Sequence, residues 1–429
     1  MISIGQIGCN STSDVISAHP QDYAISIHAK TGLMFKPGNL SSRANCMSAI
    51  NWSNLGFDII KPRSHIEYVY TDGVWDKGAL VSSTDITLNM WATALHYGQS
   101  CFEGLKAFRM KDGKIRVFRP NLNAARMQLS CHALSMAAPP TDLFLEAINR
   151  VIQDNLDLVP PYGHSGSLYI RPYVIGSGAN IAPSPPKEFK FIVQVNPVGD
   201  YYANGFNHPV KTIVQYGFDR AAPNGTGHIK AGGNYAPCMG PTAQAKKDGY
   251  TLNLFMDAKT RQYIEEFATS NFVALTKADA CGKRTYVTPR STSILGSITN
   301  RSLSEIAVKI FGWSVERRNI SWEQLKQGDF DEVAACGTAV VITPIGIIDR
   351  EVPINTVEHE AEIKRCSNET ELDALWDDTS KTVALQIESI KIDSDFSGFG
   401  SMLKVYRQIQ SGDYDGWEKL GWMLPESGL

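Results

Sequence analysis

A lysine followed by two glycines and a tyrosine is the segment of this sequence best suited to covalent chemistry. Residues 228–237 read HIKAGGNYAP. A lysine amine can join an aldehyde as a Schiff base when its pKa is low enough for it to act as a nucleophile near neutral pH. Lys230 is the candidate, and Tyr235 would offer a hydroxyl to the ring oxygen beside the imine. Gly232 and Gly233 would let the backbone approach a flat ring closely. A solvated surface lysine is the alternative, so other segments must decide.

An arginine on a predicted strand could receive a substrate carboxylate. Within residues 167–173, the two-residue period of a strand puts Tyr169 and Arg171 on one face. Leu168 and Ile170 then lie on the other face. The planar donor fork of an arginine in such an apolar strand suits a carboxylate. An ion pair within the fold is the alternative.

Two helical segments could bind a phosphate. Arg126 follows Leu122 by one helical turn, so it lies near the core-facing stripe and needs an anion there. A cofactor phosphate and an internal carboxylate fit this spacing equally well. At residues 296–299 the chain turns into a helix with Thr299 as a candidate N-cap, and the free N–H groups there could bind phosphate. The alternative is a capped helix and nothing more.

An acidic pair and a small-residue turn complete the candidate site. Glu265 and Glu266, in the segment IEEFATSN, end an apolar strand where a carboxylate is costly unless it is paired. A carboxylate opposite a pyridine nitrogen would keep that nitrogen protonated and strengthen the ring as an electron acceptor. Residues 336–339, reading CGTA, could offer backbone N–H groups and the Thr338 hydroxyl to a phosphate or carboxylate. They could also form a simple tight turn.

The elements that must position these residues predict an α+β fold in two parts. Residues 54–196 alternate short strands with amphipathic helices and predict a small domain, while residues 210–429 predict a larger domain that carries the lysine. Residues 197–209 are typical of an interdomain loop. Residues 1–53 are a predicted N-terminal extension. The patterns predict strands at 66–70, 107–109, 115–118, 167–175, 191–195, 251–256 and 263–266, and helices over 121–136, 144–151, 300–311, 321–328 and 403–409.

Composition excludes several classes of function. The chain of 429 residues has a formal net charge of -3, with 43% hydrophobic and 20% charged residues. Such a balance predicts no nucleic-acid partner. The 8 cysteines form no CxxC pair, which indicates neither a zinc site nor a disulfide framework.

No membrane segment and no mitochondrial signal is predicted. The longest apolar stretch, residues 333–348, is interrupted by Gly, Thr and Pro and is shorter than the ~20 residues that span a bilayer. The first 50 residues have no arginine before Arg43 and carry Asp14 and Asp22, which fits an Arg-rich transit peptide badly. The expected location is therefore the cytoplasm.

Taken together and in this order, the segments resemble those of the branched-chain aminotransferases, which have the type-IV fold of pyridoxal-phosphate enzymes. The resemblance extends from about Asn54 to the C-terminal tail, and its ordered motifs are far more specific than one glycine pattern. It implies a two-domain fold like that of D-amino-acid aminotransferase, with pyridoxal 5'-phosphate between the domains. The matching motifs are HYGQSCFEGLKAF (96–108), FRPNLNAARM (118–127), SLYIRPYVIG (167–176), NPVGDYY (196–202), KAGGNY (230–235), EFATSN (266–271), GSITNRS (296–302) and CGTA (336–339).

The resemblance also implies a role for each candidate residue. Lys230 would be the Schiff-base lysine and proton shuttle, and Tyr235 would bond to the ring oxygen. Glu266, rather than Glu265, would pair with the pyridine nitrogen, because the family's acid stands three residues before the threonine matched by Thr269. The implied phosphate ligands are Arg126, Ile298, Thr299 and Thr338, and the implied substrate pocket is lined by Phe57, Tyr97, Phe102, Tyr169, Arg171, Tyr201 and Thr269, with Ala339 offering its N–H to the α-carboxylate.

The implied reaction moves the amino group of leucine, isoleucine or valine to 2-oxoglutarate, giving 2-oxo acids and L-glutamate. One pocket must then accept an aliphatic side chain and a carboxylate in turn, which would explain an arginine among tyrosines. The resemblance also implies a homodimer in which Ile181 or Pro183 of a second chain completes the pocket.

Two departures from the family pattern bear on regulation and substrate. Mammalian members carry a redox CxxC pair just after the glycine-threonine turn, where this chain has Val340 and Thr343, so that regulation is not expected. Ser270 replaces a larger apolar residue, which could enlarge the side-chain site for an unusual aliphatic or aromatic amino acid of a specialised pathway.

Other reactions and a silent relative remain alternatives. A D-amino-acid transaminase, an amine transaminase or a lyase would keep the same fold, and a catalytically silent binding protein would keep no chemistry. The lysine, the acid and the phosphate ligands occur together, which disfavours the silent relative. A nucleotide-dependent oxidoreductase is disfavoured because no GxGxxG follows a strand.

Overall fold

Two mixed layers of strands and helices position the candidate residues in the computed structural model, which describes residues 50–199, 206–354 and 385–429. Both sheets lie within residues 51–429, which form one compact unit. The predicted division at residues 54–196, 197–209 and 210–429 stays a prediction.

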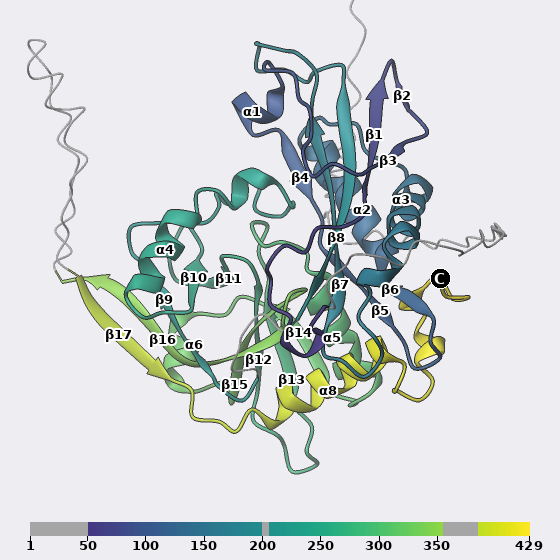
Figure 1. The fold of residues 1–429 in the computed structure, drawn as a ribbon. Helices are drawn as coiled ribbons and strands as arrows, with labels where there is room; N and C mark the ends of the chain where they lie inside the picture. The colour runs from purple at the N-terminus through teal and green to yellow at the C-terminus, as the bar shows by residue number, and fades with distance from the viewer. Residues whose placement is uncertain (1–49, 200–205, 355–384) are drawn as a thin grey trace, which may run out of the picture. The chain divides into compact units, whose positions relative to one another are not determined.

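The first sheet is antiparallel and has the order β18-β6-β5-β7-β8-β1-β2, with β3 on β1 and β4 on β7. Strand β18, from the C-terminal end of the chain, joins this sheet beside β6 (Figure 1). The strands are β1 (His65–Thr71), β2 (Val74–Trp75), β3 (Ala79–Val81), β4 (Ser100–Phe102), β5 (Leu105–Arg109), β6 (Ile115–Phe118), β7 (Ser167–Gly176), β8 (Phe189–Val198) and β18 (Met423–Leu424).

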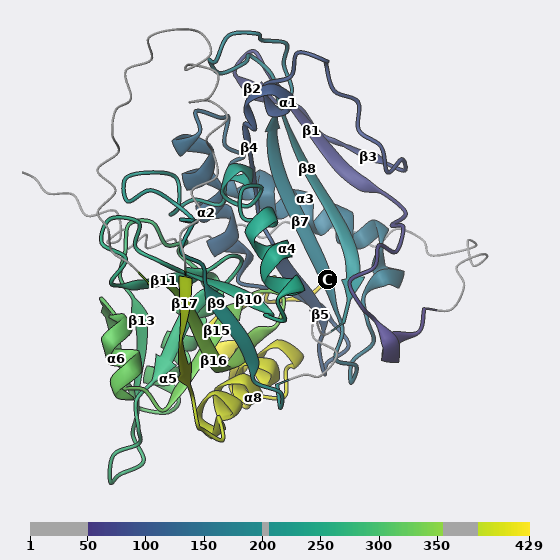
Figure 2. The ribbon, with the colours of Figure 1, turned by 90° about the vertical axis from the view of Figure 1, so that its left-hand side faces the viewer.

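Helices pack on this sheet through apolar stripes. In α3 (Thr141–Asp154) the buried residues recur at helical spacing, and Phe144 stacks on Phe191 of β8 with ring centroids 5.9 Å apart. Helix α2 (Pro120–Ala133) packs against α3, as both ribbon views show (Figures 1 and 2). Helix α1 (Thr93–Tyr97) is short and contacts β7.

The second sheet has the order β11-β10-β9-β16-β15-β12-β13-β14, and a further pairing joins β11 to β12. Strand β17 extends it beside β16. The pairs β9–β10, β9–β16 and β13–β14 are parallel and the others are antiparallel. The strands are β9 (Val210–Val214), β10 (Leu252–Met256), β11 (Ile264–Phe267), β12 (Asn271–Leu275), β13 (Thr285–Pro289), β14 (Ser314–Arg318), β15 (Glu332–Gly337), β16 (Val341–Pro353) and β17 (Leu385–Lys391).

The core of the second sheet is covered by α5 (Ile298–Lys309) and α8 (Ser397–Ser411), which pack on each other and on β15. Leu303 and Ile306 of α5 and Phe399 and Met402 of α8 are buried in one apolar cluster. The remaining elements are α4 (Met239–Lys247), α6 (Trp322–Gln327) and the 3-10 turns η1 (Trp52–Asn54), η2 (Leu156–Leu158), η3 (Gly232–Asn234) and η4 (Trp417–Leu420).

The predicted elements are found, but two predicted helix starts are wrong. Helix α2 begins at Pro120 with Arg119 as its N-cap, whereas the predicted helix began at residue 121. Helix α5 begins after Ser297, whose hydroxyl accepts from the N–H of Asn300, so Thr299 lies inside the helix. Several polar residues near a helix start can cap it, and the backbone entry decides which one does. The helix predicted over 321–328 is found as α6, and Ser321 and Gln324 form a capping box at its start.

The part of the chain that the structure describes contains neither a membrane-spanning helix nor a cluster of metal ligands. None of their helices combines the length and the apolar character that a membrane crossing requires. Their His, Cys, Asp and Glu side chains form no group of three or more that could hold a metal ion.

Candidate active site

Lys230 is held by elements that lie far from it in the sequence. Its backbone carbonyl accepts from the N–H of Phe102 in β4 (3.1 Å), and its N–H donates to the Ser130 hydroxyl of α2 (3.0 Å). Its Nζ lies 3.0 Å from the Tyr235 hydroxyl and 4.6 Å from the centre of the Phe102 ring. The amine lines a pocket that Glu266 also lines, so the alternative of a solvated surface lysine is wrong.

The pocket is lined by helix α2, by the lysine segment and by one end of the second sheet. Arg126 of α2 lines it together with residues from the turn between β11 and β12, from the residues before α5, and from the end of β15. A Cβ added at Gly337 would lie 3.5 Å from Cβ of Ser270 and 3.8 Å from the carbonyl oxygen of Thr269, so the two turns are in contact. The lining residues named by the sequence analysis are Arg126, Lys230, Tyr235, Glu266, Thr269, Ser270 and Thr338.

Glu266 is a buried carboxylate with several donors. It pairs with Arg220 at 2.7 Å and accepts from the side-chain amide of Asn271 (2.7 Å) and the N–H of Leu295 (2.9 Å). Burial raises the pKa of Glu266 to about 7, although Arg220 and the hydrogen bonds lower it. The carboxyl can therefore change its charge near neutral pH when a cation or a proton approaches.

Glu265 points into a different environment. Its carboxylate accepts from the hydroxyls of Ser291 (2.6 Å) and Ser293, and it does not line the pocket. Successive residues of a strand lie on opposite faces, so only one acid of the pair can reach the pocket. The structure thus places Glu266 in the pocket, as the sequence analysis expected.

Arg126 pairs with an internal carboxylate. Its Nε and Nη2 donate to the two oxygens of Glu103, each at 2.7 Å, and its Nη1 donates to the carbonyl of Gly296 (2.9 Å). The Glu103 side chain is fully buried and also accepts from Asn123. Of the two anions that the sequence left open for Arg126, the structure contains the carboxylate. The arginine still lines the pocket, so a phosphate could approach its Nη1.

The start of α5 offers backbone donors. The N–H groups of Ile298 and Thr299 donate to no residue that the structure describes. Ser297 lines the pocket directly, and the buried Thr299 hydroxyl contacts Tyr406 of α8 instead. Thr299 can therefore bind a phosphate through its N–H rather than through its hydroxyl.

Arg171 lies between two aromatic rings. Its guanidinium carbon is 4.8 Å from the centre of the Phe102 ring and 5.3 Å from that of Tyr169, and its Nη2 donates to the Tyr169 hydroxyl (3.0 Å). Its Nε is buried and has no hydrogen-bond partner among the described residues. The described residues form no ion pair with Arg171, so the alternative of an internal ion pair is wrong for them. A Cβ added at Gly104 would overlap the Tyr169 hydroxyl, which explains glycine there.

The other described residues expected to bind substrate do not line the pocket of Lys230. Tyr97 is half-exposed, and its hydroxyl donates to the carbonyl of Ile181 in the same chain. Phe57 is 37% exposed, and neither it nor Tyr97 lines the pocket. The carbonyl of Ala339 accepts from Lys106 (2.8 Å). Tyr201 lies outside the residues that the structure describes.

The glycines after the lysine have separate surroundings. A Cβ added at Gly232 would lie 2.5 Å from the hydroxyl of Ser100, so this glycine allows close contact with β4. At Gly233 an added Cβ would meet no protein atom within 4 Å. At Gly232 the close neighbour is therefore Ser100 of the protein, whereas the sequence analysis expected a cofactor ring.

Arg220 and Glu103 are site residues that the sequence analysis missed. Each provides the counter-charge for a residue that it did identify, namely Glu266 and Arg126. The signal was the rule that a buried charge needs a partner. The sequence could not select the partner, because Arg220 is 46 positions from Glu266 and Glu103 is 23 positions from Arg126.

The charges of the pocket suit an anionic aldehyde cofactor. Arg126, Arg220 and Lys230 bring three cationic groups, while Glu103 and Glu266 bring two carboxylates. A phosphate would balance the excess positive charge, and the N–H groups at the start of α5 would also favour a phosphate. The amine, the acid and the phosphate donors thus fit pyridoxal 5'-phosphate.

Stability of the chain without cofactor should depend on pH through Glu266. Its folded pKa of about 7 lies above the ordinary 4.5, so its contribution is fully present below pH 4.5 and is lost as pH rises through 7. We expect the unfolding free energy of the wild type, relative to Glu266→Gln, to fall by on the order of 3 kcal/mol over that window. Urea unfolding at several pH values measures it, and a constant difference would contradict it.

The chain is similar in sequence to known aminotransferases. The family model described as amino-transferase class IV matches residues 100–348. The branched-chain-amino-acid aminotransferase of Haemophilus influenzae is 41% identical over 322 residues, which is 74% of this chain and 91% of that protein. The enzyme of the same name from Helicobacter pylori is 43% identical over 296 residues, 69% of this chain and 85% of the relative. Aminotransferase poxL of Penicillium oxalicum is 39% identical over 304 residues, 70% of this chain and 81% of the relative.

Solved structures share the fold. The branched-chain amino acid aminotransferase of Escherichia coli superposes with a TM-score of 0.62 at 23% identity, covering 83% of this chain and 98% of that one. The branched-chain amino acid aminotransferase of Thermobaculum terrenum, in its PLP form, gives a TM-score of 0.60 at 18% identity, covering 85% of this chain and 99% of that one. The α+β fold expected from the sequence is confirmed.

Proposed function

Because the chain belongs to the class IV aminotransferase family, we propose that it transfers the amino group of leucine, isoleucine or valine to 2-oxoglutarate. The chain is a pyridoxal-phosphate-dependent aminotransferase whose substrates are an amino acid and a 2-oxo acid. The observation that carries the proposal is the Lys230 amine, 3.0 Å from the Tyr235 hydroxyl in a pocket shared with Glu266 and Arg126. Relatives named for branched-chain amino acids supply the substrate class.

Pyridoxal 5'-phosphate, when bound, supplies an aldehyde that joins amines and a ring that accepts electron density. Lys230 can take a proton from the substrate Cα on its Nζ and return it, because the amine lies in the pocket and not in bulk water. The Tyr235 hydroxyl orients that amine. Glu266 can hold a proton on a pyridine nitrogen, since its pKa of about 7 adjusts to the charge opposite it.

Arg171, together with Phe102 and Tyr169, would form a surface beside the pocket of Lys230 that accepts the second substrate. Its unpartnered Nε can donate to the distal carboxylate of 2-oxoglutarate, and the rings of Phe102 and Tyr169 can contact an aliphatic side chain. Leucine needs no such donor. Both substrates thus fit the same surface.

Replacing Arg171 with methionine should therefore separate the two half-reactions. A lost charge-assisted hydrogen bond should lower kcat/KM for 2-oxoglutarate about 10- to 100-fold, while leucine changes little. The half-reactions are measured separately by stopped-flow absorbance. Arg109→Met, at the far end of β5, is the matched control. Equal losses for both substrates would contradict the assignment of Arg171.

Substrate profiling tests the proposed function directly. We expect kcat/KM to be highest for leucine, isoleucine or valine, with L-glutamate as the chiral product. A preference for longer or aromatic amino acids would favour the alternative of a specialised pathway, which Ser270 in the pocket lining supports. D-glutamate, or no turnover of any amino acid, would reject the proposal.

The homodimer is also a proposal, supported by an exposed apolar surface. Met90 and Leu95, around α1, are 71% and 61% exposed, and Ile181 is 72% exposed. These segments form one surface, because the N–H of Asn180 donates to the carbonyl of Trp91 (3.0 Å). Such a surface suits a second copy of the chain. Ile181 or Pro183 of a second chain would then complete the pocket, and sedimentation velocity would show a monomer if this is wrong.

Three further sequence expectations stay proposals. They are the two-domain division of the chain, the individual roles of the site residues, and the cytoplasmic location. Cell fractionation tests the last of these, and recovery in organelles would reject it.

A further inference from the structure

A chain of buried amides leads from Glu266 to helix α5. The side-chain amide of Asn271 in β12 donates to Glu266 (2.7 Å), and the amide of Asn300 in α5 donates to the Asn271 oxygen (3.0 Å). The Tyr286 hydroxyl of β13 donates to the Asn300 oxygen (2.9 Å). Asn271, Asn300 and Tyr286 are at most 5% exposed. Glu266 and Asn271 line the pocket of Lys230, and Asn300 is not among its described lining residues.

The neighbours of Asn271 decide which way its amide points. The carboxylate of Glu266 and the carbonyl of Leu295 (3.2 Å) accept from one end of the amide, so that end is the NH2 group. The Asn271 oxygen at the other end then needs a donor, and the NH2 group of Asn300 provides it. Along the chain of amides, the hydrogen bonds are therefore all donated toward Glu266.

The amide of Asn300 is fixed in turn by its own neighbours. Its NH2 group also donates to the Thr288 hydroxyl (2.8 Å), which donates to the carbonyl of Phe272 (3.2 Å). Its oxygen accepts from Tyr286. Turning the amide by half a turn would place its oxygen against the oxygen of Asn271 and would leave buried polar groups unpaired, which is costly. Asn300 therefore has one favourable orientation.

Asn300 also belongs to the helix start that offers N–H groups to a phosphate. Its backbone N–H donates to the hydroxyl of Ser297, the N-cap of α5 (3.2 Å). The backbone N–H groups of Ile298 and Thr299 lie in the same turn. One residue thus links the group expected to bind phosphate with Glu266, the group expected to face the pyridine nitrogen.

Several charged groups surround Glu266 besides these amides. Arg220 pairs with its Oε1 (2.7 Å), and the N–H of Leu295 donates to the same oxygen (2.9 Å). Its Oε2 is the oxygen to which Asn271 donates. The other titratable groups near Glu266 are Lys230, Glu265, Cys238 and Cys336. Burial raises the pKa of both thiols and keeps them neutral, while the charge of Glu265 raises the pKa of Glu266.

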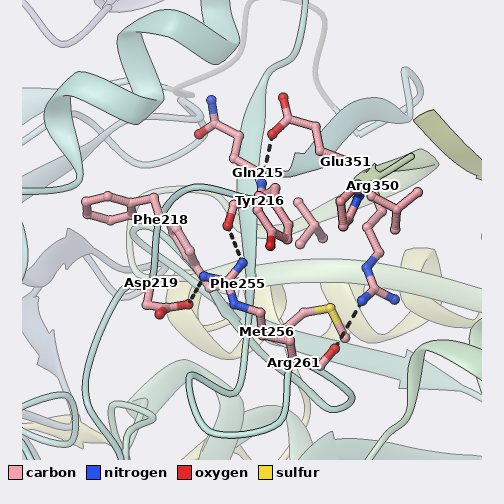
Figure 3. Close-up of a pocket in the computed structure, with 12 residues that line it drawn as sticks. Gln215, Tyr216, Phe218, Asp219, Phe255, Met256, Arg261, Arg350 and Glu351 are labelled. Atoms are coloured by element: carbon pink, nitrogen blue, oxygen red, sulfur yellow. Dashed lines mark hydrogen bonds and ion pairs between the residues drawn. The ribbon is translucent and has the colours of Figure 1, made fainter. Parts of the chain in front are cut away.

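Arg220 is held by contacts that do not involve the amides. It follows Asp219, which pairs with Arg261 (2.9 Å), and Arg261 also donates to the carbonyl of Tyr216. Figure 3 shows these contacts in the segment that follows β9. A change at Asn300 therefore leaves this cation in place.

We propose that Asn300 is a positioning residue, which holds the Asn271 amide with its NH2 group on Glu266 and so favours the ionised carboxylate that holds a proton on the pyridine nitrogen. Asn300 acts only through Asn271. The effect on the cofactor rests on the proposed function, whereas the effect on Glu266 in the cofactor-free chain does not.

Infrared titration of the cofactor-free chain tests the effect on Glu266. The band of its protonated carboxyl is followed against pH, with Glu266→Gln as the blank. In the wild type we expect a midpoint at about pH 7. Asn300→Leu should raise this midpoint by about 1 pH unit, because the Asn271 amide can then turn and its hydrogen bond to the charged form is weakened.

A double variant tests whether Asn300 acts through Asn271. Asn271→Leu should raise the midpoint by about 1–2 pH units, since it removes the donor itself. Adding Asn300→Leu to Asn271→Leu should shift the midpoint no further. Additive shifts would show that Asn300 acts by another route and would overturn the proposal.

Asn155→Leu is the matched control. Asn155 is also a buried asparagine, and its amide donates to the carbonyls of Ser64 (3.0 Å) and Val151 (2.8 Å). This variant should lower the melting temperature, because it removes buried hydrogen bonds, but it should leave the midpoint of Glu266 unchanged. If Asn300 had a structural role alone, Asn300→Leu would behave in the same way.

Binding of pyridoxal 5'-phosphate, measured by equilibrium dialysis, gives a second readout. At pH 7 Asn300→Leu should bind the cofactor about 3- to 10-fold more weakly than the wild type, because a smaller fraction of Glu266 is ionised. At pH 9 the difference should nearly vanish, since the carboxyl is ionised in both proteins. Asn155→Leu should bind as the wild type does at both pH values.

An unchanged infrared midpoint in Asn300→Leu overturns the proposal. If Asn300→Leu does not fold, Asn300→Ala takes its place in the single and the double variant, with the same expected shifts. A wild type that binds no pyridoxal 5'-phosphate would reject the proposed function, and the infrared titration would still decide whether Asn300 sets the charge of Glu266.

Discussion

Lys230→Ala should lower kcat for transamination of leucine by about 10⁴-fold, because both the covalent partner of the cofactor and the proton carrier are lost. Phosphate and ring contacts through Arg126 and Glu266 would remain, so the variant should still bind pyridoxal 5'-phosphate. Production of the 2-oxo acid of leucine measures the rate, and equilibrium dialysis measures cofactor binding. This is the largest effect expected from any single change in the chain.

Lys246→Ala is the matched control, since Lys246 is an exposed lysine of α4. It should leave kcat unchanged. A Lys230→Ala variant that keeps more than a small part of the wild-type rate would remove the amine from the mechanism. Equal losses in both variants would point to a general effect on folding.

Arg220→Met should cost about 3–5 kcal/mol of stability, because it leaves the buried carboxylate of Glu266 without its cation. Both side chains are nearly buried, at 5% and 4% exposed. The loss should be larger at pH 8 than at pH 6, since protonation of Glu266 relieves the unpaired charge at the lower pH. Urea unfolding of the cofactor-free chain at both pH values measures the loss.

A double variant separates the ion pair from packing. Arg220→Met combined with Glu266→Gln should recover most of the lost stability, because no charge is then left buried. Arg119→Met breaks the ion pair with Glu305 (2.8 Å), whose pKa is lowered, so its cost should not change between pH 6 and pH 8. A loss at Arg220 that is independent of pH and is not recovered in the double variant would show that packing explains it.

The loss of stability expected for Arg220→Met is large because a buried charge loses its partner. The sequence did not predict which residues form these ion pairs. The sequence showed that Glu266 and Arg126 need counter-ions. For Arg126 it could not distinguish a cofactor phosphate from a carboxylate of the protein. The tertiary structure packs β4 against α2, and Glu103, next to β4, then forms the ion pair with Arg126. The phosphate can use only the donors that this pairing leaves.

The sequence by itself determined most helices and strands and named the candidate reactive residues. Strand alternation placed Tyr169 and Arg171 on one face, and the burial pattern of β7 confirms it. Local patterns also indicated the lysine segment and the acidic pair of β11, and the resemblance to a known family then selected Glu266 from that pair. These features depend on spacing within a few residues, which the chain's own geometry fixes.

Only the tertiary structure decided which charges pair and which residue caps α5. Arg220 pairs with Glu266, and Glu103 pairs with Arg126, through contacts between segments far apart in the chain. A sequence states that a buried charge or a free helix end needs a partner. Many residues can satisfy that need, and only packing of the whole chain selects one, because the selection depends on distances that no local pattern contains.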